Sequence, residues 1–183
     1  MSNSLPIRHI DSFCETTPTV YSNRGASGID GIVHTALGVA LGSCARCTLL
    51  VGDLAALHDL GALAALRKSS ANLVVVVLNN QGGAIFKFLP IATSSFFDPF
   101  FTTPHEHDFR ASAEGFGLPY QACSTREEFK VAYEQARRSG GPHILEVQTT
   151  IDDTHSGVAA VRQAAMLAAA PVAGRLADGA QEF

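Results

Sequence analysis

Two apolar runs in the first half of the chain end abruptly in polar and glycine residues. Residues 47–51 are followed by Gly-Asp, and residues 73–78 are followed by the sequence NNQGG at 79–83. Both runs are rich in Leu and Val without a polar alternation, which is typical of strands buried on both faces of a parallel sheet. Between them, residues 54–67 are rich in Ala and Leu and long enough for one helix. The pattern predicts a strand–helix–strand unit.

The polar residues that follow the two runs predict a binding site. A right-handed crossover brings the carboxyl ends of both strands to one edge of the sheet, so Asp53 and Asn80 should lie side by side. Taken alone, Asp53 could equally be a helix N-cap. A carboxylate, an amide oxygen and a flexible Gly-Gly backbone together suit a hard cation that also binds phosphate and water. The helix that begins at Leu54 directs free N–H groups and its positive dipole end to the same place. We therefore expect a magnesium–diphosphate site.

The rest of the chain continues the alternation of helices and strands. Apolar spacing and glycine, proline and capping signals predict helices at residues 5–13, 29–41, 108–116, 125–138 and 158–176, and strands at 20–21, 120–123 and 143–148. Thr125 and Glu128 have the spacing of a capping box. We therefore predict the α/β class, with a doubly wound, mostly parallel sheet of five or six strands and helices on both faces.

Residues 84–101 differ from the rest, because they hold six of the eleven phenylalanines together with proline, serine and threonine. The segment is neither periodic nor polar enough for a solvated loop, so we expect a lid or a subunit contact. His105 and His107 follow it, and their spacing does not place them on one helical face. We therefore expect no metal site at these two histidines.

Composition excludes several classes of function. The 183 residues are 46% hydrophobic and 16% charged, which indicates a globular chain without disordered character. A net charge of −4 without a Lys/Arg cluster argues against nucleic acid as a partner. No apolar run approaches the roughly 20 residues of a membrane span. Residues 1–15 carry several charges and no signal-peptide core, so we expect a cytoplasmic protein.

Three segments carry a resemblance to a known family. The segments are SNRGASGIDG at 22–31, GDLAALHDL at 52–60 and NNQGGAIFKFLP at 79–90. They are similar to the 2-succinyl-5-enolpyruvyl-6-hydroxy-3-cyclohexene-1-carboxylate synthases, thiamine-diphosphate (ThDP) enzymes of menaquinone and phylloquinone biosynthesis. Residues 3–8 resemble the start of that family's C-terminal domain. The resemblance implies a ThDP- and metal-binding domain at 1–154 and a helical tail at 155–183.

The resemblance also implies roles for individual residues. The metal, Mg²⁺ or Mn²⁺, would take the Asp53 carboxylate, the Asn80 side-chain oxygen and the Gly82 carbonyl, with two diphosphate oxygens and a water. In the family, the residue that matches Ile29 holds ThDP in its bent shape. Without the resemblance, Ile29 would be interpreted as a core residue. The remaining residues that would bind the cofactor are Ser27, Gly28, Gly52 and Leu54. Those implied to bind substrate are Ser4, Arg8, Arg24, Ile85 and Phe86, the arginines because guanidinium groups grip carboxylates.

The implied reaction is decarboxylation of 2-oxoglutarate and addition of the resulting succinyl-semialdehyde carbanion to isochorismate, both substrates being dicarboxylates. Family members carry an N-terminal pyrimidine-binding domain with an activating glutamate, and they act as homo-oligomers. The chain holds no such domain, so we expect no catalytic residue in it and little activity alone. Two alternatives stay open: a domain of another ThDP enzyme, acetohydroxyacid synthase- or decarboxylase-like, or a non-catalytic ThDP-binding subunit. A plastid location is the alternative if the chain belongs to a plant- or alga-like fusion protein.

Overall fold

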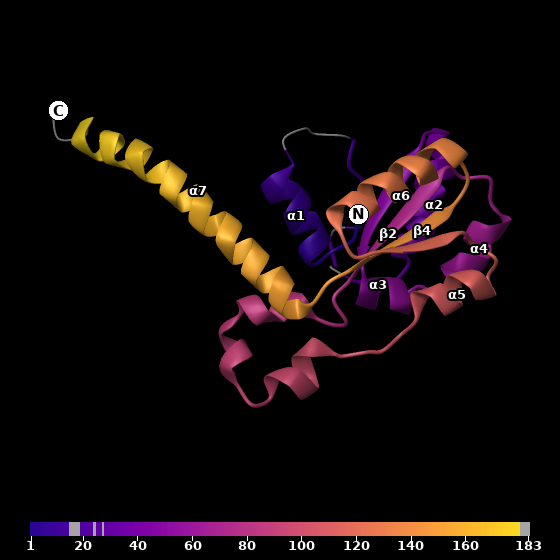
Figure 1. Ribbon diagram of the computed structural model, residues 1–183, viewed down its shortest axis with the longest axis horizontal. Coiled ribbons are helices and arrows are strands. Elements are labelled where there is room, and N and C mark those ends of the chain that lie inside the picture. Colours follow the sequence, from indigo (N-terminus) through magenta and orange to yellow (C-terminus); the bar gives the residue numbers. More distant parts are fainter. Residues whose placement is uncertain (15–18, 24, 27, 180–183) are drawn as a thin grey trace.

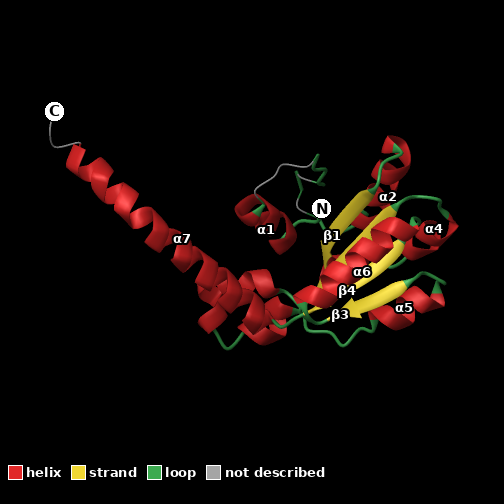
Figure 2. Cartoon of the chain, turned by 45° about the horizontal axis from the view of Figure 1, so that its top comes forward, coloured by secondary structure: helices red, strands yellow, loops and turns green. Residues whose placement is uncertain are grey.

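The computed structural model describes residues 1–14, 19–23, 25–26 and 28–179, the last nine of these by their backbone alone. Four strands form one parallel sheet in the order β1-β2-β4-β3 (Figure 2). Their bounds are β1 Cys47–Gly52, β2 Leu73–Asn79, β3 Tyr120–Cys123 and β4 His143–Gln148. The predicted α/β class is confirmed. The predicted five or six strands are wrong for the described residues, because residues 20–21 form no strand there.

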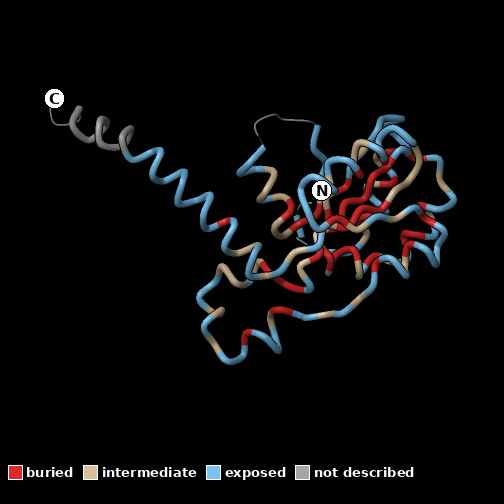
Figure 3. Tube along the Cα trace, viewed as in Figure 1, coloured by how far each residue is buried: buried red, intermediate tan, exposed pale blue. Residues whose placement is uncertain are grey.

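Helices cover both faces of the sheet, as predicted for a doubly wound fold (Figure 1). One face packs against α2 (Ile32–Ser43), α3 (Asp53–His58), α4 (Ala62–Lys68) and α5 (Phe109–Gly115). The other face packs against α6 (Arg126–Ser139). Successive residues of β2 therefore serve different cores: Val75 and Val77 face the larger cluster, and Val74 and Val76 face α6. Figure 3 shows the buried residues gathered along the strands.

The helix predicted at residues 54–67 is two helices, α3 and α4, with a turn at residues 59–61 between them. Asp59 is the physical reason. Its buried carboxylate accepts the N–H groups of Val33 at 2.7 Å and His34 at 3.2 Å, the second and third residues of α2. The Asp59 side chain therefore caps a neighbouring helix, and Gly61 follows where the chain turns.

The remaining helices agree with the sequence in place and differ at their ends. Helix α1 is Leu5–Phe13 as predicted, and Thr125 and Glu128 form the predicted capping box of α6. Helix α2 begins at Ile32, not at residue 29, and α7, Ile151–Gly179, begins before residue 158. Helix α7 runs away from the sheet, with its start beside the turns that follow β2 (Figure 1).

The phenylalanine-rich segment forms three short helical turns. They are η1 (Ala84–Phe88), η2 (Pro90–Thr93) and η3 (Asp98–Thr102). Phe101 connects η3 to η1, since its ring lies edge-on to Phe86 at 5.8 Å and stacked on Phe97 at 6.3 Å between centroids. The segment therefore has a small aromatic core of its own instead of a regular helix.

Candidate metal and diphosphate site

Asp53 joins the ends of two neighbouring strands. It follows β1, begins α3, and is only 3% exposed. Its Oδ1 accepts the Leu54 N–H at 2.7 Å, while its Oδ2 accepts the N–H groups of Gly82 at 2.9 Å and Asn80 at 3.2 Å. Burial raises the pKa of the Asp53 carboxyl above its ordinary value, although the bonds from Leu54 and Gly82 and the neighbouring His105 pull the pKa back in part. The predicted meeting of Asp53 and Asn80 is confirmed.

The Asn80 side-chain amide meets two acceptor oxygens at this edge. One of its two polar atoms lies 3.2 Å from Asp53 Oδ2 and 2.8 Å from the Gly82 carbonyl oxygen. Without a metal, hydrogen bonding places the amide nitrogen at this position, where it donates to both oxygens. A bound cation would turn the amide so that its oxygen faces the other two. Adjacent ligands of an octahedral Mg²⁺ at 2.0–2.1 Å are about 2.9 Å apart, so the spacing of these atoms suits such an ion.

The loop that carries these oxygens needs its glycines. Gly82 has a φ of +152°, and a Cβ there would collide with the Thr102 carbonyl oxygen. A Cβ on Gly83 would lie 2.6 Å from the Phe101 carbonyl oxygen. The Gly83 N–H donates to the Thr102 carbonyl at 2.5 Å. The end of η3 therefore closes directly onto the loop, which leaves space only for glycine.

A buried carboxylate that the sequence did not reveal supports the same loop through Asn79. Glu146 of β4 is 3% exposed and accepts the Asn79 amide N–H at 2.7 Å and the Tyr120 hydroxyl. The Asn79 side-chain oxygen accepts the Gln81 N–H at 3.0 Å. Burial, followed by the hydrogen bond to Glu146 and the charge of Glu146, raises the pKa of Tyr120 well above its ordinary value. A glutamate inside the apolar strand at 143–148 was the available signal.

The N-terminus of α3 should attract an anion less strongly than the sequence predicted. Helix α3 has six residues, so its dipole is small, and the Leu54 N–H is engaged by the Asp53 carboxylate. The described residues contain no group of three or more His, Cys, Asp or Glu side chains that could hold a metal. The predicted ligand set needs only one such side chain, because Asn80 and Gly82 supply the other two oxygens.

The described residues of the predicted cofactor set, apart from the metal ligands, lie in the loop before α2, at the end of β1 and at the start of α3. Arg24 and Ser27 lie outside the described residues. The carbonyl of Gly28 accepts the Asn3 amide N–H at 2.6 Å, which links the loop before α2 to the start of α1. Ile29 is 37% exposed, so it is not a core residue. Gly52 is half-buried, and its N–H donates to the Ser2 hydroxyl at 3.4 Å.

Arg8 and Ser4 lie together on the N-terminal helix, since the exposed Arg8 guanidinium donates to the Ser4 carbonyl at 2.6 Å. Ile85 is half-buried and Phe86 is 37% exposed, both on η1 directly after the metal loop. No hydrogen bond or ion pair links Arg8 to Asp53 in the described part of the chain. The substrate roles of these residues stay predictions.

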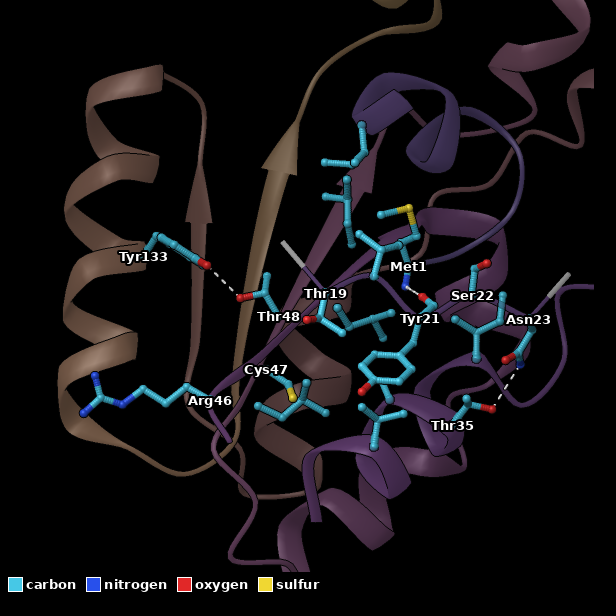
Figure 4. A pocket seen from close by; sticks show the side chains of 18 residues that line it. Met1, Thr19, Tyr21, Ser22, Asn23, Thr35, Arg46, Cys47, Thr48 and Tyr133 are labelled. Atoms are coloured by element: carbon cyan, nitrogen blue, oxygen red, sulfur yellow. Dashed lines mark hydrogen bonds between the residues drawn. The ribbon is translucent and has the colours of Figure 1, made fainter. Parts of the chain in front are cut away.

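A cavity of about 410 Å³ is lined by β1, by α2 and by residues 19–23 (Figure 4). Its labelled walls include Met1, whose amino group donates to the Tyr21 carbonyl at 2.8 Å, and Thr48, whose hydroxyl lies 2.7 Å from that of Tyr133. Asp53, Asn80 and Gly82 do not line this cavity. The candidate metal site at the carboxyl ends of β1 and β2 is therefore separate from it.

Comparison with known proteins decides the family. Residues 12–147 match the family model described as thiamine pyrophosphate enzyme, C-terminal TPP binding domain. The chain belongs to this family of thiamine pyrophosphate (TPP) enzymes. The resemblance predicted from the sequence is confirmed as well, since the TPP-binding domain is similar to 2-succinyl-5-enolpyruvyl-6-hydroxy-3-cyclohexene-1-carboxylate synthases from several organisms.

The similarity to these synthases covers most of the TPP-binding domain and a small part of each relative. The protein from Rubrobacter xylanophilus is 53% identical over 81% of the chain and 26% of the relative. The protein from Salinibacter ruber is 46% identical over 81% of the chain and 25% of the relative. The chain thus spans about a quarter of the length of the curated relatives it matches.

A solved structure supports the fold. The thiamine diphosphate-dependent 4-hydroxybenzoylformate decarboxylase of Rhodococcus jostii RHA1 matches 63% of this chain and 22% of its own, with a TM-score of 0.56 and 32% identity. The TPP-binding domain has the α/β fold of a ThDP enzyme. Within the described residues, no helix has both the length and the apolar character needed to cross a membrane.

Proposed function

We propose that this chain is the cofactor- and metal-binding part of an enzyme that decarboxylates 2-oxoglutarate and adds the remaining four-carbon unit to isochorismate. The observation that carries the proposal is the convergence of Asp53 Oδ2, the Asn80 side-chain amide and the Gly82 carbonyl, with one polar atom of the amide 3.2 Å and 2.8 Å from the other two. With the amide oxygen turned to this position, the three groups would hold Mg²⁺ or Mn²⁺, which in turn would hold the diphosphate of ThDP.

The residues of this chain would bind and orient, and none would transfer a proton. When bound, ThDP supplies the electron sink for decarboxylation and carbon–carbon bond formation. Asp53, Asn80 and Gly82 would hold its diphosphate through the metal. The exposed side chains of Ile29 and Phe86 are free to contact ligand, which supports their implied roles against the cofactor and at the wall of the substrate pocket.

The active enzyme would need more polypeptide than this chain. The curated relatives are about four times as long as the region they share with it, which supports the expectation that a pyrimidine-binding domain supplies the activating glutamate. Residues 1–154 would form the binding domain, with residues 155–183 as its helical tail. We propose that the complete enzyme is a homo-oligomer in the cytoplasm.

Metal-dependent cofactor binding tests the proposal. We expect ThDP with Mg²⁺ to raise the unfolding temperature of the wild type, and neither alone to do so. Asp53→Asn should abolish the rise because it removes the ligand charge. Gln81→Asn is the matched control in the same loop: its side chain is exposed, and asparagine tolerates the φ of +61° at this position. An equal response of wild type and Asp53→Asn would contradict the proposal.

A second candidate is a 2-oxoacid decarboxylase domain, which the likeness to the Rhodococcus decarboxylase favours. Arg8 supports the first candidate, because a guanidinium suits a second substrate carboxylate. The two are distinguished by adding the N-terminal three quarters of the Rubrobacter relative to this chain. Carbon dioxide release from 2-oxoglutarate supports the first candidate, and release only from aromatic 2-oxoacids supports the second. Cofactor binding without release from either substrate would favour the non-catalytic subunit.

A further inference from the structure

His105 lies against the carboxylate that we assign to the metal. Its side chain is 10% exposed, and its Nε2 is 3.3 Å from Asp53 Oδ2. The neighbouring His107 has a different role, because its Nε2 lies 2.9 Å from the Ser112 hydroxyl. The two histidines therefore diverge, in agreement with the prediction that they do not form a metal site together. Only His105 reaches the sheet edge.

One hydrogen bond of the ring indicates which nitrogen carries the proton. His105 Nδ1 accepts the N–H of His107 at 3.2 Å and uses its lone pair to do so, which places the proton of a neutral ring on Nε2. The ring also lies edge-on to the buried Phe109, with 6.2 Å between centroids. These two contacts hold Nε2 beside Asp53, and a nitrogen that carries a proton cannot ligate a metal.

The Nε2–H has no other partner. It is buried, and in the described part of the chain it makes no hydrogen bond of good geometry; Asp53 Oδ2 is within ion-pair distance but off the hydrogen-bond direction. A buried donor without a partner is costly, and this one lies beside a carboxylate. Carboxylates that bind metals are held by further donors, and losing such a donor typically weakens metal binding about 10–100-fold.

We propose that His105 is a positioning residue that holds Asp53 Oδ2 for the metal. This proposal rests on the proposed function, since it assumes that Asp53 is a ligand. The two backbone donors to Oδ2, from Asn80 and Gly82, come from the metal loop itself. His105 approaches Oδ2 from outside that loop, with its Nε2 at 3.3 Å, and it follows η3, whose Thr102 carbonyl accepts the Gly83 N–H. The phenylalanine-rich segment is thereby tied to the metal ligand at two points.

Three variants separate positioning from packing. His105→Leu removes the donor and keeps an apolar side chain. His105→Gln places an amide N–H at a similar reach to Nε2. His107→Leu makes the same change beside the same ring, because His107 also lies edge-on to Phe109, at 4.9 Å between centroids. The probe is Mn²⁺ with inorganic pyrophosphate, with free Mn²⁺ measured by electron paramagnetic resonance, and the unfolding temperature of each metal-free variant is the control for folding.

We expect His105→Leu to weaken Mn²⁺ binding about 10–100-fold, His105→Gln to recover most of the loss, and His107→Leu to bind as the wild type does. The proposal is overturned if His105→Leu binds with wild-type affinity. It is also overturned if His105→Leu and His107→Leu lose affinity equally, since packing alone would then explain the loss.

A measurement without metal separates failure of this proposal from failure of the proposed function. If wild type and Asp53→Asn bind Mn²⁺ equally, the proposed function fails. The position of the proton on the His105 ring then tests separately whether His105 interacts with Asp53. Long-range ¹H–¹⁵N spectra of the metal-free chain should show the proton on Nε2, with a shift of its signal in Asp53→Asn. A proton on Nδ1, or no shift, overturns the positioning role.

Discussion

The backbone N–H of Gly82 donates to the carboxylate of Asp53 across 2.9 Å, although the two residues are 29 positions apart. The contact exists because β1 and β2 are parallel neighbours with Gly52 opposite Leu78, so the residues after each strand meet at one edge. It shapes the metal loop from the strand beside it. The geometry of the candidate metal site at Asp53, Asn80 and Gly82 therefore depends on the parallel sheet and on the glycines after β2.

Gly82→Ala should disrupt the loop. The substituted Cβ would collide with the Thr102 carbonyl oxygen, and a φ of +152° is strained for alanine. We expect the free energy of unfolding to fall by about 1–3 kcal/mol and Mg²⁺-dependent ThDP binding to be lost. Urea unfolding and thermal-shift titration measure the two effects.

Gly38→Ala is the matched control for that substitution. Gly38 lies inside α2 with open space around its Cβ position and no left-handed φ. Alanine should therefore be neutral or raise stability by about 0.4–1 kcal/mol, and ThDP binding should not change. Equal losses at Gly38 and Gly82 would argue against a local role for Gly82.

Glu146→Leu should lower the free energy of unfolding, although leucine is an apolar residue in an apolar strand. The substitution leaves the Asn79 amide and the Tyr120 hydroxyl without their acceptor. The unpaired, buried Asn79 amide costs about 1–3 kcal/mol and the half-buried Tyr120 hydroxyl costs less, so we expect a loss of about 1–4 kcal/mol in chemical denaturation. Glu146→Gln keeps an acceptor and should lose less. If leucine is as stable as glutamine, the network does not support the fold.

Tyr120 should make stability depend on alkaline pH. Its pKa is raised in the folded state by burial and by Glu146. A raised pKa means that the stabilisation is fully present below the pKa of the unfolded chain, about 10, and is lost as the pH rises through the higher folded value. We expect the free energy of unfolding of the wild type to fall more steeply above pH 10 than that of Tyr120→Phe. Equal slopes of unfolding free energy against pH for the two proteins would show that Tyr120 does not cause the pH dependence.

Asp59→Ala should loosen the start of α2. The variant leaves the Val33 and His34 N–H groups without the carboxylate that caps them, and the loss of a cap costs about 0.5–2 kcal/mol. Hydrogen exchange at Val33 and His34 should accelerate. Asp11→Ala, at an exposed position on α1, is the control and should change neither quantity. Unchanged exchange in Asp59→Ala would show that α2 does not need this cap.

The sequence could predict what local pattern and chain topology determine. Apolar runs without alternation were enough to place β1 and β2, and from parallel topology the meeting of Asp53 and Asn80 followed. The break between α3 and α4 could not be predicted, because it depends on Asp59 reaching the start of α2, a contact between distant segments. The roles of Glu146 and His105 were missed for the same reason: each depends on partners that only the folded chain brings near.

Anomalous diffraction from a crystal grown with Mn²⁺ and ThDP tests most directly whether Asp53, Asn80 and Gly82 bind one divalent ion. We expect one strong Mn²⁺ peak between Asp53 Oδ2, the Asn80 side-chain oxygen and the Gly82 carbonyl, at about 2.0–2.3 Å from each. A Mn²⁺ peak elsewhere with ThDP bound, or an Asn80 amide turned to donate to Asp53 with no ion between them, would contradict the account.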